Sequence, residues 1–118
     1  MKYILNIQSI SDIITNSSSE VFICSINDNP DTLVQEIQEL LDTLAENLGY
    51  TERIAYVEVA NESGSNKWYN YSWNKGDILI ESTSDNSIPY PIMELLQDLQ
   101  YTPKFEDRII NVERHHLG

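Results

Sequence analysis

The sequence contains little cysteine, glycine or proline and no long apolar run. It has one cysteine, four glycines and four prolines in 118 residues. The lone Cys24 excludes an intramolecular disulfide and any zinc site built from several cysteines. No segment approaches the roughly 18 apolar residues that a transmembrane helix needs. Residues 1–8 lack the apolar run and the small-residue cleavage site of a signal peptide. We therefore expect a cytoplasmic protein.

Basic residues are also scarce. Seven Lys and Arg stand against nineteen Asp and Glu, giving a formal net charge of -12 and a sequence pI near 4.2. Between Tyr3 and Glu52 there are nine carboxylates and no Lys or Arg. Nucleic-acid phosphates and anionic lipids are bound by clustered basic side chains. The composition therefore disfavours direct binding to nucleic acid or membranes. It leaves two explanations for the acidity, solubility alone or a positively charged protein partner.

The length and composition indicate one globular domain over residues 1–118. A chain of this length buries roughly two thirds of its extended surface on folding, so it forms a core without disulfides or metals. Its residues are 41% hydrophobic and 22% charged, which is typical of globular proteins. No repeat, linker or low-complexity tract separates domains.

The first half predicts two strands and a long helix. Alternation of Tyr3, Leu5 and Ile7 predicts a strand over residues 2–10, and the apolar run 21–26 predicts a second. The helix is expected to begin at Pro30 with Asn29 as its cap and to end at Gly49. Apolar residues recur along it at helical spacing: Leu33, Val34, Ile37, Leu40, Leu41, Leu44 and Leu48.

The second half predicts three strands, a short helix and a final strand. Residues 53–60, 67–73 and 77–83 are expected to form an antiparallel meander, with a short connection at 74–76. Residues 92–99 predict an amphipathic helix, and residues 105–115 a last strand. The order ββαβββαβ favours an α+β fold, a mostly antiparallel sheet with two helices on one face. One strand face, formed by Tyr69, Tyr71 and Trp73, is expected to pack under the first helix.

The candidate partner-binding residues lie on the long helix and on the aromatic strand. A helical period of 3.6 residues places four carboxylates on the polar side of the helix, where they form an acidic stripe: Glu36, Glu39, Asp42 and Glu46. Trp68 lies on the strand face opposite the packed aromatics, and an exposed aromatic can anchor a protein interface. We predict these five residues as a partner-binding site.

Three other segments are weaker candidates for chemistry. The connection Thr15–Glu20 has hydroxyls but no Gly or Lys, so it does not match a phosphate-binding loop. His115 and His116 would point to opposite faces of a strand, so the two rings would not readily chelate one metal. Cys24 lies in an apolar run, where a thiol behaves as a small hydrophobe. No catalytic residue, metal ligand or cofactor is predicted.

Two segments carry a family resemblance. Residues Thr15–Phe22 and Arg114–Gly118 resemble segments of small uncharacterised proteins encoded by bacteriophages and prophages. The resemblance implies a phage context rather than an activity. Small phage proteins often act on host machinery, and some anti-restriction and anti-CRISPR inhibitors are acidic mimics of DNA.

The sequence thus leads to one favoured function and two alternatives. We favour a non-enzymatic acidic inhibitor, phage-derived and acting in the bacterial cytoplasm, that occupies a basic surface of a host nucleic-acid enzyme or defence complex. One alternative is a metal-dependent hydrolase whose Asp and Glu ligands are brought together by the fold. The other is a structural or assembly protein that forms homotypic contacts, so self-association stays open.

Overall fold

The computed structural model describes residues 19–83 and 88–117. The strand predicted at residues 2–10 lies outside the described residues. The elements are, in chain order, β1 (Ser19–Ile26), α3 (Pro30–Asn47), β2 (Ala55–Val59), β3 (Gly64–Asn66), β4 (Tyr71–Trp73), β5 (Ile78–Ser82), α4 (Tyr90–Gln97), the 3-10 helix η1 (Leu99–Tyr101) and β6 (Ile109–Leu117).

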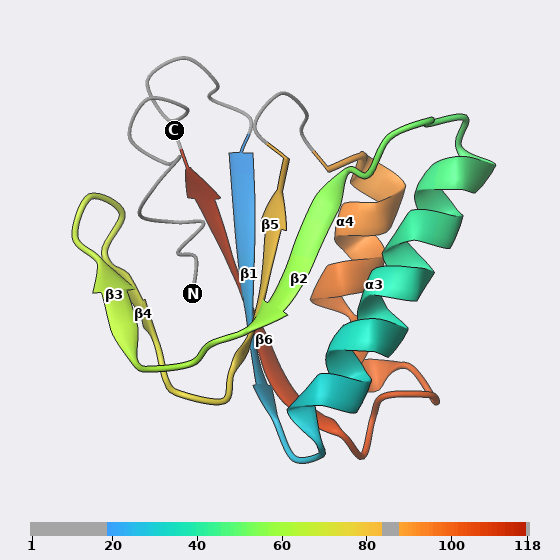
Figure 1. Ribbon diagram of the computed structural model, residues 1–118. Coiled ribbons are helices and arrows are strands. Elements are labelled where there is room, and N and C mark those ends of the chain that lie inside the picture. Colours follow the sequence, from blue (N-terminus) through green and yellow to red (C-terminus); the bar gives the residue numbers. More distant parts are fainter. Residues whose placement is uncertain (1–18, 84–87, 118) are drawn as a thin grey trace.

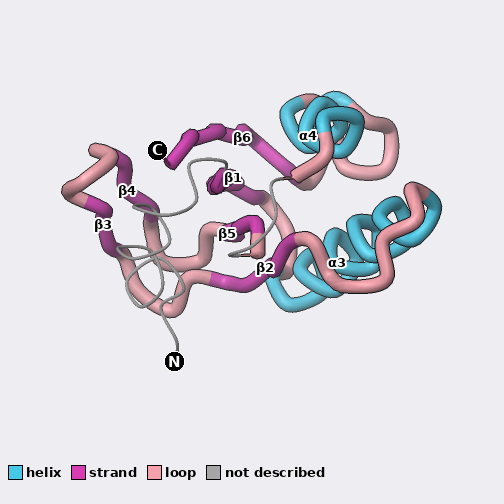
Figure 2. The backbone as a smooth tube through the Cα atoms, turned by 90° about the horizontal axis from the view of Figure 1, so that it is seen from above, coloured by secondary structure: helices cyan, strands magenta, loops and turns pink. Residues whose placement is uncertain are grey.

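An antiparallel sheet with two helices on one face confirms the predicted α+β fold. The sheet order is β2-β5-β1-β6, and every neighbouring pair is antiparallel. Helices α3 and α4 lie on one side of this sheet (Figure 1). The β3–β4 hairpin forms a separate two-stranded sheet on the other side, as the view from above shows (Figure 2). The two sides of the sheet therefore carry different structures.

Helix α3 has the predicted boundaries. The side chain of Asn29 accepts hydrogen bonds from the amides of Asp31 and Thr32 at 2.9 and 3.2 Å, and Pro30 occupies the first helical position. The helix ends at Asn47, and Gly49 follows it with a φ of +94°, a conformation that glycine adopts without strain. Leu33, Ile37, Leu41 and Ala45 form its buried face.

Strand β1 is buried on both faces, which explains why its sequence is a continuous apolar run. Phe22 and Cys24 join the core under the helices. Val21 and Ile23 join a second cluster on the hairpin side. Burial raises the pKa of the Cys24 thiol to about 12, with a smaller contribution from the charge of Asp77. The thiol is therefore a core group, as predicted.

The predicted three-strand meander is wrong in its pairing. Strand β2 pairs directly with β5, with Val57 opposite Ile80. Residues 67–73 do not form one strand between them, because residues 67–70 make the turn of the hairpin and only Tyr71–Trp73 is extended. The segment between the first two predicted strands of the meander supplies the partner strand β3, Gly64–Asn66. Local alternation did not reveal that a hairpin folds away from the sheet.

The expected packing of the aromatic face under the first helix is also wrong. Tyr71 and Trp73 are 5% and 6% exposed, but they pack with Val21, Ile23 and Leu79 on the side of the sheet opposite the helices. Gly64 permits this packing, because the Trp73 ring lies against it where a Cβ would stand. Aromatic residues therefore build the second core.

The last helix and the last strand lie within four residues of their predicted positions. Helix α4 starts at Tyr90, and β6 spans Ile109–Leu117. Ser19 and Glu20 were expected in a connection, but they open β1, where Glu20 is 2% exposed. Among the helices of the described ranges, none has the length and apolarity to cross a membrane.

Candidate binding surface

The acidic stripe spans the width of the polar face of α3. Glu36 and Asp42 are six residues apart, which at 100° per residue places them about 120° apart around the helix axis. Glu39 and Glu46 lie between them, farthest from the buried face. The two flanking carboxylates are half-buried and the two central ones are exposed. The four residues therefore have different neighbours.

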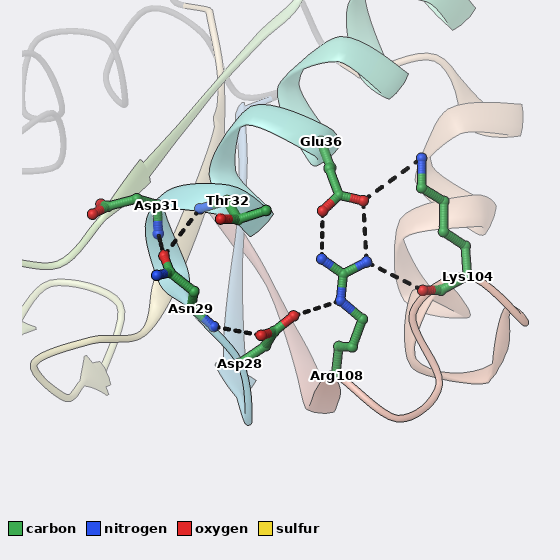
Figure 3. Close-up of polar contacts among 7 residues, drawn as sticks. All are labelled: Asp28, Asn29, Asp31, Thr32, Glu36, Lys104 and Arg108. Carbon is green, nitrogen blue, oxygen red and sulfur yellow. Dashed lines mark hydrogen bonds and ion pairs between the residues drawn. The ribbon is translucent and has the colours of Figure 1, made fainter.

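Glu36 belongs to an ion-pair network at the base of the sheet (Figure 3). Arg108, just before β6, donates to both carboxylate oxygens of Glu36 and, from Nε at 2.6 Å, to Asp28. Lys104 lies 3.8 Å from Glu36. Hydrogen bonds from Arg108 lower the pKa of Glu36 and of Asp28. Glu36 therefore ties α3 to the start of an edge strand.

Asp42 holds the opposite edge of the sheet. Arg53, just before β2, donates from Nε and Nη2 to the two oxygens of Asp42 at 3.2 and 2.9 Å. Gln38 on the same flank accepts from the amide of Val57 at 2.9 Å and donates to the carbonyl of Ala55 at 3.0 Å. These bonds occupy outward backbone groups of β2. Both flanks of the stripe are thus neutralised by structural contacts.

Glu39 and Glu46 are the stripe residues left for a partner. Neither makes an ion pair with any residue that the structure describes. The last turn of α3 contains no basic residue, so the negative end of the helix dipole is not offset there. Leu48 and Tyr50, 49% and 39% exposed, follow directly. Acidic and apolar groups therefore meet at this end of the helix.

A hollow of about 230 Å³ lies at this end of the helix. Its lining includes Glu46, Tyr50 and Glu52, with Arg53 on one side held by Asp42. We name the surface formed by Glu39, Glu46, Tyr50 and Glu52 the acidic helix surface.

Trp68 is exposed but does not belong to the acidic helix surface. It is 75% exposed and lies in the turn between β3 and β4. That hairpin is on the far side of the sheet from α3 (Figure 2). The stripe and Trp68 were predicted as parts of one binding site, but the sheet separates them. They therefore lie on different faces of the molecule.

A cluster around the buried carboxylate of Glu20 was not predicted from the sequence. Arg114 donates from Nε to Glu20 at 2.8 Å, and His116 Nδ1 lies 2.6 Å from the other carboxylate oxygen. His115 points to the opposite face, as predicted, and stacks on Tyr71 with 4.6 Å between ring centroids. The hydrogen bond to Glu20 raises the pKa of Arg114. These contacts fasten β6 to β1 and to the hairpin.

A groove at the start of β6 was not predicted from the sequence either. Its volume is about 550 Å³, and its lining comes from the β1–α3 connection, η1, the η1–β6 connection and the start of β6: Asn27, Gln100, Tyr101, Glu106, Asp107, Ile109 and Ile110. Tyr101 and Ile110 are 72% and 61% exposed. A register shift against β1 leaves Ile110 without a partner across the ladder, as in a β-bulge. No local pattern in the sequence indicates this groove.

Within residues 19–83 and 88–117, no three His, Cys, Asp or Glu side chains are grouped to hold a metal ion.

Comparison with known proteins gives no family model, curated protein or solved structure that matches the chain.

Proposed function

We propose that the chain is a non-enzymatic acidic binding protein that docks its acidic helix surface on the basic, nucleic-acid-binding surface of a partner protein. In this proposal the protein is phage-derived, acts in the bacterial cytoplasm and inhibits its partner by occupying that surface.

The distribution of counter-ions supports this proposal. On the helix side, the described basic residues Arg53, Lys104 and Arg108 are all engaged by carboxylates of the same chain. Glu39, Glu46 and Glu52 have no such partner among the described residues. A partner's Lys or Arg would therefore meet carboxylates that need not first break an internal ion pair.

The spacing of the carboxylates favours long-range electrostatic attraction of a basic partner over close imitation of the phosphate spacing of DNA. Glu39 and Glu46 are seven residues apart, or about 10 Å along the helix axis. Duplex DNA carries one phosphate per about 1.7 Å of axis. The acidic helix surface therefore steers a basic partner and raises the association rate. Tyr50 and Leu48 supply the apolar contact area beside the carboxylates.

The experiment is an affinity capture from bacterial lysate with matched charge reversals. Wild type, E39K, E46K and E62K are immobilised at equal density, and bound proteins are eluted with duplex DNA and identified by mass spectrometry. Glu62 is the control, because it is an exposed carboxylate outside the acidic helix surface, in the segment leading to β3. Each variant changes the net charge by the same amount.

Wild type and E62K are expected to capture a nucleic-acid-binding protein that duplex DNA elutes. E39K and E46K are expected to recover much less of that protein. Equal recovery by all four proteins, or no DNA-eluted protein from any of them, would overturn the proposal.

A further inference from the structure

Two exposed features far apart on the molecule carry opposite charge. One is the tip of the β3–β4 hairpin, residues 67–70, which we call the knob. The other is the groove at the start of β6. We propose that the knob of one copy of the chain enters the groove of a second copy, so that the chain self-associates head to tail.

The knob is apolar, basic and rigid. Trp68 is 75% exposed, and Lys67 beside it makes no ion pair with any described residue. The side chain of Asn66, itself 8% exposed, accepts from the amides of Trp68 and Tyr69 at 2.9 and 3.2 Å. Asn70 completes the turn with a φ of +55°. The turn is therefore pre-organised with its indole in solvent.

The base of the hairpin is anchored to the rest of the molecule. Trp73 Nε1 donates to the carbonyl of Glu62 at 3.1 Å, and the amide of Lys75 donates to Ser63 at 3.1 Å. Tyr71 packs on the sheet and stacks on His115. Anchoring of this kind lowers the entropy cost of ordering the knob on binding.

The groove offers the opposite charge and two exposed apolar side chains. Glu106 and Asp107 form part of its wall, and neither makes an ion pair with a described residue. Tyr101 and Ile110 supply exposed apolar surface. The volume of about 550 Å³ falls within the roughly 300–1,000 Å³ of pockets that hold small organic ligands, so one indole fits.

Backbone hydrogen bonds hold the wall of the groove in place. The amide of Glu106 donates to the carbonyl of Thr102 at 2.8 Å, and the amide of Asn27 donates to the carbonyl of Arg108 at 2.8 Å. Phe105 is 2% exposed and fixes this segment to the core. The groove is therefore formed before any partner binds.

Charge identifies the second copy as the occupant. Among the described basic side chains, those without an ion pair are Lys67 and Lys75, and both belong to the hairpin segment. The unpaired Glu106 and Asp107 lie in the connection from α4 to β6, on the other side of the molecule (Figures 1 and 2). A knob therefore cannot reach the groove of its own chain.

Addition of strands at the sheet edges is a less suitable route to self-association. The outer edge of β2 is occupied by Gln38. On β6, the amide of Val112 donates to the side chain of Gln100 at 2.9 Å. Side chains that occupy outward backbone groups block pairing with another strand.

The contact is expected to be weak and salt-dependent. A buried Trp contributes about 150–250 Å², and stable interfaces bury at least about 1,200 Å² in total. Self-association of the chain is therefore measured by sedimentation equilibrium from micromolar to millimolar protein concentration, at low and high salt. Head-to-tail contacts form rings or open chains rather than stopping at a two-fold dimer.

Four single variants and one double variant test the contact. W68A removes the knob, and Y90A is its matched control, because Tyr90 on α4 is 68% exposed and belongs to neither surface. W68A is expected to weaken association about thirtyfold, the effect of losing an interface hot spot, and Y90A to leave it unchanged. K67E and E106K should each weaken association, and the double variant K67E/E106K should restore it.

A mixing experiment tests the head-to-tail geometry. W68A keeps an intact groove, and I110E keeps an intact knob but places a charge in the groove. Each variant alone should be monomeric, whereas an equimolar mixture should form a one-to-one dimer and nothing larger. Wild-type protein that stays monomeric at all concentrations would overturn the proposal, as would an effect of Y90A equal to that of W68A. An equimolar mixture of W68A and I110E that stays monomeric would also overturn the proposal. The surfaces tested do not include Glu39 or Glu46, so the result is independent of the capture experiment.

Discussion

The contact between Gly64 and Trp73 determines whether a methyl group added at residue 64 stabilises or destabilises the fold. A Cβ added at Gly64 would lie 2.8 Å from Cε2 of Trp73 and closer still to Cζ2. The indole is 6% exposed and bonded through Nε1 to Glu62, so it has little freedom to move away. G64A should therefore destabilise the fold by about 1–3 kcal/mol, the usual cost of overpacking a core.

The same substitution should become favourable when the ring is removed. In a strand, Gly costs about 0.5–1 kcal/mol relative to Ala because it loses more backbone entropy on folding. The variant W73L removes the ring atoms that the new methyl would meet. G64A in the W73L background should therefore be neutral or stabilising, which gives a coupling energy of about 1 kcal/mol or more.

The assay is a double-mutant cycle by urea unfolding. Wild type, G64A, W73L and the double variant are followed by far-UV circular dichroism in one sulfate buffer, because sulfate strengthens burial and keeps W73L folded. For a chain of 118 residues, each kcal/mol corresponds to about 4 °C in Tm, which gives a second readout. An equal cost of G64A in both backgrounds would refute the steric explanation.

Three further predictions concern the cap, the ion-pair network and the thiol. N29A should lose the cap bonds to α3 and about 1 kcal/mol of unfolding free energy, whereas N29D should retain most of it; equal losses in urea unfolding would contradict this. Because Arg108 lowers the pKa of Asp28 and Glu36 below their ordinary values of 3.8 and 4.5, the network should stabilise the fold above those values and cease to do so as the pH falls through the lowered ones. R108Q should therefore flatten the acid dependence of the urea midpoint, and an unchanged slope would count against the network. With its pKa raised to about 12, Cys24 should react with Ellman's reagent only on unfolding, as a rapid reaction in urea but not in buffer would show.

The elements that were predicted correctly are those set by local chemistry. Asn29, Pro30 and Gly49 fix the ends of α3 through caps that involve residues a few positions away. The apolar run of β1 and the period of α3 require burial whatever the partner is. Local chemistry therefore gave the α+β class and the main helix.

The binding surface could be predicted only in part. Helical periodicity placed the four carboxylates of the stripe on one side of α3. It did not show that Arg108 and Arg53, 72 and 11 residues away from their partners, would neutralise Glu36 and Asp42. Long-range ion pairs carry no local pattern, so sequence reasoning alone could not select Glu39 and Glu46.

The sequence by itself determined the excess of carboxylates, the lone thiol, the capped helix and the placement of four carboxylates on one side of it, because these depend on composition and on neighbours within a few residues. The tertiary structure decided which face of the sheet the aromatic residues cover and which carboxylates keep their charge unopposed. It also separated Trp68 from α3 by the full thickness of the sheet and assembled the groove at the start of β6. Strand pairing and counter-ions join residues far apart in the chain, and only folding brings those residues together.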